Sequence, residues 1–148
     1  MIRLKKILTI FFAMIVLTAC SGEENQYDYI FTGESEHWEA EYSFSGTEIW
    51  GEEDGTTTYS NENRDEFVLT YKGTLKELSS LESLEYSYDT SAGGGSGTRE
   101  FDEPPKEVTF KSGGSTGNGA KVNDDEVIQV KVKWNDYEES FELHNESS

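Results

Sequence analysis

Residues 128–143 read IQVKVKWNDYEESFEL, and this stretch decides the fold. Apolar residues occupy every second position of 128–134, with Gln and Lys between them. That period of two is typical of a strand with one face in a core and the other in water. Asn135 and Asp136 are turn residues, and a second alternating run follows them at 137–143. The stretch therefore predicts a β-hairpin.

A two-residue loop fixes the register of this hairpin. Apolar side chains then meet across the two strands in three pairs, Trp134–Tyr137, Val130–Phe141 and Ile128–Leu143. Val132 is the exception, because it lies opposite Glu139. A longer turn is an alternative, since Asp is less suited than Gly to the second turn position.

Four further alternating runs lie upstream of the hairpin. They predict strands at 38–44, 66–72, 84–88 and 108–110. Leu residues at every third position, after a Thr with capping-box spacing, predict a short helix or 3₁₀ turn within 74–84. Two Gly/Ser-rich segments, 91–97 and 112–119, are predicted to be mobile connections.

Six to eight short strands in about 120 residues predict an all-β fold. We expect an antiparallel β-sandwich that is immunoglobulin-like in architecture, with at most one short helix. A small barrel is the alternative.

The first nineteen residues form a separate unit. Three basic residues are followed by an apolar stretch from Ile7 that runs 13 residues to Ala19, directly before Cys20. A permanent membrane span needs roughly 20 apolar residues, so this pattern predicts a signal peptide. Two alternatives are an ordinary secretory signal and a retained membrane anchor.

Leu17-Thr18-Ala19-Cys20 resembles the lipobox of bacterial lipoproteins. Together with the runs 31–38, 130–134 and 141–143, it is similar to the small lipoproteins of Bacillus-type Gram-positive bacteria. The resemblance implies cleavage before Cys20, a diacylglycerol on its sulfur with a possible N-acyl group, and a place on the outer face of the cell membrane. It carries over no other site residue. The implied organisation is a signal peptide at 1–19, a lipidated tether at 20–26 and a β-sandwich at 27–148.

Charge and cysteine content exclude several functions. Of 12 Lys and Arg residues, three lie in the first nineteen positions, so cleavage would leave 9 against 30 Asp and Glu, a formal charge of 9 − 30 = −21. Nucleic-acid binding needs basic patches and is not expected. Cys20 is the single cysteine of the chain, so a disulfide, a thiol nucleophile and a zinc-thiolate site are excluded from the mature domain.

No catalytic motif is present. The chain has two histidines, His37 and His144, without HExxH spacing, and no Gly-x-Ser-x-Gly elbow on a predicted strand-helix turn. We therefore expect a non-enzymatic binding or accessory module that meets an envelope protein or a wall component. An envelope hydrolase is a minority alternative. The sequence predicts no cofactor beyond the lipid on Cys20 and specifies no oligomeric state.

Weak calcium binding at the surface is the main alternative. Hard cations take several oxygen ligands from bent loops, and acidic residues cluster at predicted turns. The candidate ligands are Glu52, Glu53, Asp54, Asp124 and Asp125. Trp50, beside Gly51 and the first of these clusters, is predicted to be exposed and to belong to an interaction patch.

Overall fold

Eight antiparallel strands and one 3₁₀ turn make up the fold, in a computed structural model that describes residues 22–117 and 119–146. In chain order the elements are β1 (Glu23–Glu34), β2 (Trp38–Glu53), β3 (Thr56–Tyr71), η1 (Glu77–Ser80), β4 (Ser83–Thr90), β5 (Gly93–Glu100), β6 (Thr109–Gly117), β7 (Ile128–Trp134) and β8 (Tyr137–Asn145). The predicted all-β antiparallel class is confirmed. The helical pattern at 74–84 becomes the single turn η1, at which the amide of Glu77 donates to Oγ1 of Thr74.

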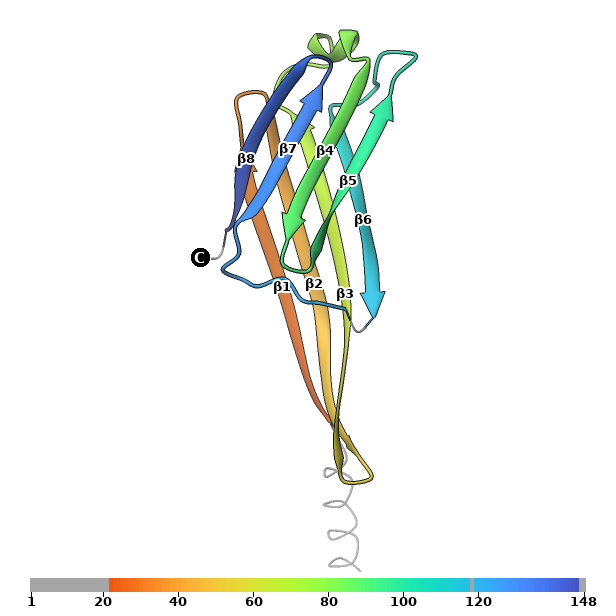
Figure 1. Cartoon of the computed structure of the whole chain (residues 1–148), viewed down its shortest axis with the longest axis vertical. Helices are drawn as coiled ribbons and strands as arrows, with labels where there is room; N and C mark the ends of the chain where they lie inside the picture. The colour runs from red at the N-terminus through yellow and green to blue at the C-terminus, as the bar shows by residue number, and fades with distance from the viewer. Residues whose placement is uncertain (1–21, 118, 147–148) are drawn as a thin grey trace, which may run out of the picture.

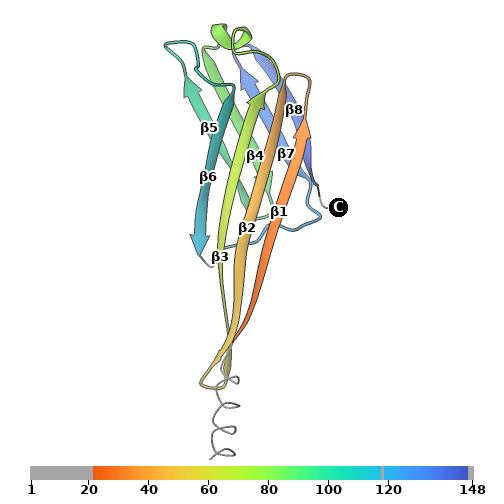
Figure 2. The same ribbon diagram turned by 180° about the vertical axis from the view of Figure 1, so that it is seen from behind.

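The strands form two four-stranded layers, β1-β2-β3-β6 and β5-β4-β7-β8 (Figures 1 and 2). The layers are joined along one side by a short pairing of β1 with β8, at Phe31–Asn145 and Thr32–His144. On the other side β5 and β6 are the two ends of the strand order. In immunoglobulin domains the third strand leaves the sheet of the first two, whereas here β3 stays beside β2. The likeness is therefore one of architecture, with a different connectivity.

The β7–β8 hairpin has the predicted register. Trp134 pairs with Tyr137, Val130 with Phe141 and Ile128 with Leu143. Asn135 takes the left-handed conformation that a tight turn requires, with φ 50°. Val132 lies opposite Glu139, as the two-residue loop dictates.

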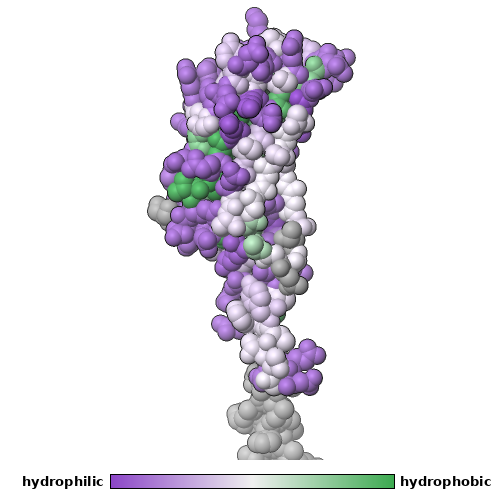
Figure 3. Space-filling model, viewed as in Figure 1, coloured by the Kyte–Doolittle hydropathy of each residue, from purple (hydrophilic) through white to green (hydrophobic). Residues whose placement is uncertain are grey.

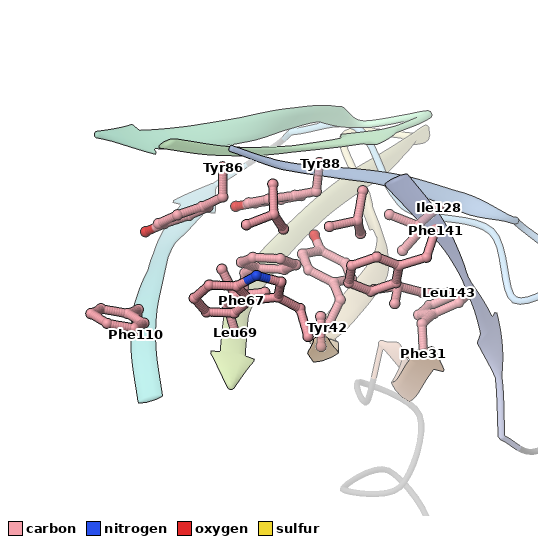
Figure 4. Close-up of a cluster of buried hydrophobic side chains, with 14 of the residues drawn as sticks. Phe31, Tyr42, Phe67, Leu69, Tyr86, Tyr88, Phe110, Ile128, Phe141 and Leu143 are labelled. Carbon is pink, nitrogen blue, oxygen red and sulfur yellow. The ribbon is translucent and has the colours of Figure 1, made fainter. Parts of the chain in front are cut away.

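Aromatic rings fill the space between the layers (Figure 4). The Phe67 ring from β3 stacks on Tyr88 of β4, with centroids 4.5 Å apart, and on Tyr86 at 5.5 Å. Tyr42 of β2 packs against Tyr88 at 5.4 Å, and its hydroxyl donates to Asp65 at 3.0 Å. Burial raises the pKa of Tyr42, so the hydroxyl keeps its proton and acts as a donor.

The prediction of mobile connections at 91–97 and 112–119 is wrong, because most of these residues belong to β5 and β6. Gly95 and Gly97 lie opposite Tyr88 and Tyr86. A Cβ atom at either glycine would come within 2.5 Å of a tyrosine side chain. The glycines are thus strand residues that leave room for large rings on the neighbouring strand.

A three-stranded stem projects from the two layers (Figure 1). It consists of residues 23–26 of β1, 47–53 of β2 and 56–60 of β3. At about 3.3 Å per residue the stem is roughly 20 Å long. The predicted tether at 20–26 overlaps it, since Glu23–Gln26 is strand. Among the described residues, no helix is long and apolar enough to span a membrane.

Candidate functional site

η1 and the β7–β8 turn lie at the end of the molecule opposite the stem (Figure 1), and residues of both line a pocket of about 290 Å³. We call it the distal pocket. It is formed by η1, the β7–β8 turn, the end of β3 and the segment before β2. Its main side chains are His37, Tyr71, Glu77, Leu78, Trp134 and Tyr137. The surface in Figure 3 is mostly hydrophilic, and Tyr137 is the most exposed large hydrophobic residue of the described chain, at 64%.

Asn135 holds the two sides of the distal pocket together. Its Oδ1 accepts hydrogen bonds from the amides of Glu82 (2.8 Å) and Ser83 (3.3 Å). Its Nδ2 donates to the carbonyl of Ser80 at 3.1 Å. The β7–β8 turn is therefore fixed to η1 and the start of β4, which gives the pocket a preformed shape.

Glu139 and His37 form the polar centre beside the pocket. Nδ1 of His37 lies 2.5 Å from Oε2 of Glu139. The backbone amide of His37 (2.9 Å) and the hydroxyl of Ser35 (2.5 Å) both donate to Oε1. The imidazole lies 5.7 Å from the Trp134 ring. The Glu139 carboxylate thus orients the imidazole through Nδ1. Nε2 is the ring nitrogen that does not take part in this contact.

The pKa values of the pair move apart. The hydrogen bond to Glu139 raises the pKa of His37 above its ordinary value, more than partial desolvation lowers it. Partial burial raises the pKa of Glu139, but the hydrogen bonds from Ser35 and His37 outweigh burial, and the net shift is downward. The geometry therefore favours an imidazolium beside a carboxylate.

The arrangement differs from a Ser-His-acid triad. In such a triad the serine hydroxyl donates to the histidine, which is oriented by the acid. Here the Ser35 hydroxyl donates to Glu139 instead. Within the described part of the chain, Glu36, His37 and Glu139 are also the one group whose ligand atoms lie close enough to share a metal ion, all within 4.8 Å.

The predicted calcium ligands lie in two separate places. Glu52 and Glu53 end β2 and Asp54 lies in the turn at the tip of the stem, whereas Asp124 and Asp125 lie between β6 and β7. In the residues that the structure covers, none of the five joins a group of three metal-ligating side chains. Calcium binding stays a prediction, without a gathered site to support it.

Trp50 is exposed, as the sequence predicts, with 41% of its surface accessible. It lies on the stem, and its ring centroid is 4.5 Å from that of Tyr59. Ile49 beside it is 45% exposed. Whether Trp50 contacts a partner stays a prediction. Cys20 and the predicted signal peptide at 1–19 lie outside the described residues.

A larger hollow of about 770 Å³ lies where the stem joins the two layers. It is open to solvent, and Tyr27 is the one aromatic residue of its lining. The Tyr27 ring already stacks on Phe44 at 5.8 Å and has the Lys121 ammonium at 4.2 Å. The distal pocket, which gathers several aromatic rings and the His37–Glu139 pair, is the better candidate site.

Sequence reasoning missed both His37 and Glu139 as site residues. The signal available for Glu139 was its place opposite Val132, among pairs that are otherwise apolar. Comparison with protein-family models, with curated proteins and with solved structures finds no match.

Proposed function

We propose that the chain is a lipid-anchored protein of the outer membrane face, whose non-enzymatic β domain uses the distal pocket to bind a component of the cell envelope. The observation that carries the proposal is that the expected lipid site and the distal pocket belong to opposite ends of the molecule. Gly22, two residues after the expected lipid site Cys20, lies against the Trp50 carbonyl on the stem. η1 and the β7–β8 turn, which line the distal pocket, lie at the other end (Figure 1).

This arrangement, with the lipid site at one end and the pocket at the other, suits a tethered receptor. Two residues of extended chain reach about 7 Å, so lipid on Cys20 would hold the stem close to the membrane. The stem and the length of both layers would then keep the distal pocket clear of the lipid headgroups. The negative charge of the domain would also oppose contact with anionic lipid, which favours an upright domain.

Binding is favoured over hydrolysis by the hydrogen bonds at the site. The Ser35 hydroxyl, which contacts the His37–Glu139 pair, donates to the carboxylate and is not activated by the imidazole. A hydrolase would have to use water, with Nε2 of His37 as the base. The His37–Glu139 pair is the observation that keeps an envelope hydrolase as the second candidate.

Replacing Cys20 tests the anchor. We expect the C20S chain to incorporate no labelled lipid and to leave the detergent phase in a phase-partitioning assay, because the thioether would have no sulfur to form on. Cells that express the unchanged chain are the reference. Equal lipid incorporation and equal partitioning of the two chains would refute lipidation at this residue.

Binding of the lipoprotein to isolated cell envelopes tests the pocket. Tyr137 is exposed at the rim of the pocket, and Tyr59 is a similarly exposed tyrosine on the stem. We expect Y137A to weaken envelope binding by about tenfold, as truncation of an aromatic contact residue commonly does. Y59A is the matched control and should bind as the unchanged chain does. Equal effects of both variants would contradict a role for the distal pocket.

A further inference from the structure

We infer that the distal pocket binds a small quaternary ammonium group, with aromatic rings around the cation and Glu77 as its counter-ion. This inference rests on the proposed function and adds the chemical class of the ligand. It is carried by the charge, the aromatic content and the size of the pocket.

The charges around the distal pocket favour a cation. Of the nine residues that line the distal pocket, Glu77 is the one with a permanent charge, and no Lys or Arg is among them. His37 carries a charge only when protonated, and Glu139 then neutralises it at 2.5 Å. Glu36 adds a further carboxylate next to this pair. The nearby Lys72 is held by Glu34 at 3.2 Å. The field in the pocket therefore favours a cation.

The aromatic rings that line the distal pocket also favour a cation. Tyr71 reaches the pocket from the end of β3, and Trp134 and Tyr137 reach it from the two sides of the β7–β8 turn. Trp134 and Tyr137 stack with centroids 5.4 Å apart, and the Tyr71 hydroxyl donates to Glu77 at 3.4 Å. Ring faces attract cations, and an aromatic enclosure with a carboxylate is suited to alkylated ammonium groups.

Of the remaining lining residues, Asn135 and the two leucines favour a methylated cation over a bare amine. A primary ammonium needs three hydrogen-bond acceptors to replace its water. Asn135 offers none, since its amide is engaged with Ser80, Glu82 and Ser83. Leu78 and Leu81 add apolar surface. A volume of about 290 Å³ admits a trimethylammonium head with a short chain and excludes a folded partner.

Calorimetric titration of the full-length lipoprotein in a detergent without ammonium groups tests the inference. The probes are choline and its neutral isostere 3,3-dimethylbutan-1-ol, which has the same shape without the charge. We expect saturable binding of choline and binding of the isostere that is at least about tenfold weaker. Equal binding of both probes, or no saturable binding of choline, would overturn the cation inference.

Two variants test whether choline binds at Glu77. E77Q keeps the shape of the side chain and removes its charge, so we expect it to weaken choline binding by about tenfold while leaving the isostere unchanged. E52Q at the tip of the stem is the matched control and should leave both titrations unchanged. An equal loss in E52Q would refute a specific role of Glu77.

The two proposals fail in different ways. If Y137A lowers envelope binding but choline neither binds nor competes, the distal pocket has another ligand and the cation inference is wrong. If choline binds but Y137A leaves envelope binding unchanged, the proposed function is wrong.

Discussion

Glu139 occupies an inward position of β8, where a carboxylate has to be paired to be stable. Its oxygens receive the Ser35 hydroxyl, the His37 amide and the His37 ring. A partly buried carboxylate with three donors costs far less than an unpaired one, and its loss would leave those donors without a partner. The pair therefore serves both the stability of this end of the fold and the orientation of His37.

Stability should depend on pH through this pair. The pKa of His37 is raised in the folded protein, so its contribution is complete below about pH 6.5 and is lost as pH rises through the folded pKa. The pKa of Glu139 is lowered, so its contribution is complete above its usual value near 4.5 and is lost at lower pH. We expect the melting temperature to fall as pH rises above about 6.5, and H37Q to lack this fall.

His144 provides the control for that experiment. It lies on the outer surface, with Nε2 3.3 Å from Glu142. H144Q should keep the pH profile of the unchanged chain, as followed by circular dichroism during heating. If H144Q flattens the profile and H37Q does not, the assignment to the His37–Glu139 pair is wrong.

For the His37–Glu139 pair, the sequence predicts less than the structure shows. The hairpin register correctly places Glu139 opposite Val132. Its partner His37 is 102 positions away, however, and no local pattern joins residues at that separation. The site depends on the folding of the chain, which brings the start of β2 to the end of the β7–β8 hairpin.

Among the elements, the edge strand β5 shows how glycines can belong to a strand. Its inward positions Gly95 and Gly97 are covered by the rings of Tyr88 and Tyr86. Glycine clusters usually indicate loops, and that general tendency is the reason the sequence predicts a mobile connection there. Strand propensity depends on the neighbouring strand, which the sequence pattern of β5 alone does not include.

G95A should destabilise the protein, because the added Cβ would lie 2.5 Å from the Tyr88 hydroxyl and 2.6 Å from Cζ of its ring. Tyr88 is buried and stacked on Phe67, so it has little room to move. Overpacking of this kind costs about 1–3 kcal/mol, measurable by urea denaturation.

Gly114 on the opposite edge strand β6 is the control for G95A. The nearest atom to a Cβ at Gly114 is Oδ1 of Asp65, 3.9 Å away, an ordinary contact. G114A should therefore change the free energy of unfolding by less than about 0.5 kcal/mol. A similar loss in both variants would mean that glycine flexibility, and not space for Tyr88, is what matters.

The lengths of β2 and β3 exceed the predicted runs at 38–44 and 66–72 for a physical reason. Both strands continue into the stem. Stem residues have no core to face, so the alternation of apolar and polar residues that reveals a strand disappears. The sequence therefore predicts the buried segments of these strands and misses their exposed extensions.

For the whole molecule, the alternating runs predict the all-β class but not the order of the strands. The two layers are joined by β1 and β8, the first and last strands, through two residue pairs. The pairing of β1 with β8 depends on all the side-chain contacts between the two layers, including those of Phe67 with Tyr86 and Tyr88. Each alternating pattern shows which face of its strand is buried. It does not show which other strand packs against that face.

The net charge of the chain should make its stability depend on salt concentration. The chain carries −18, and like charges repel within the compact state. Sodium chloride screens that repulsion, so raising it from about 20 to 500 mM should increase the melting temperature by about 2–5 °C. Because the acidic candidates at the stem tip and between β6 and β7 do not converge, we expect calcium and magnesium at equal ionic strength to add equal shifts. A larger calcium shift that D54N abolishes and D125N preserves would contradict this prediction and establish a calcium site at the turn of the stem.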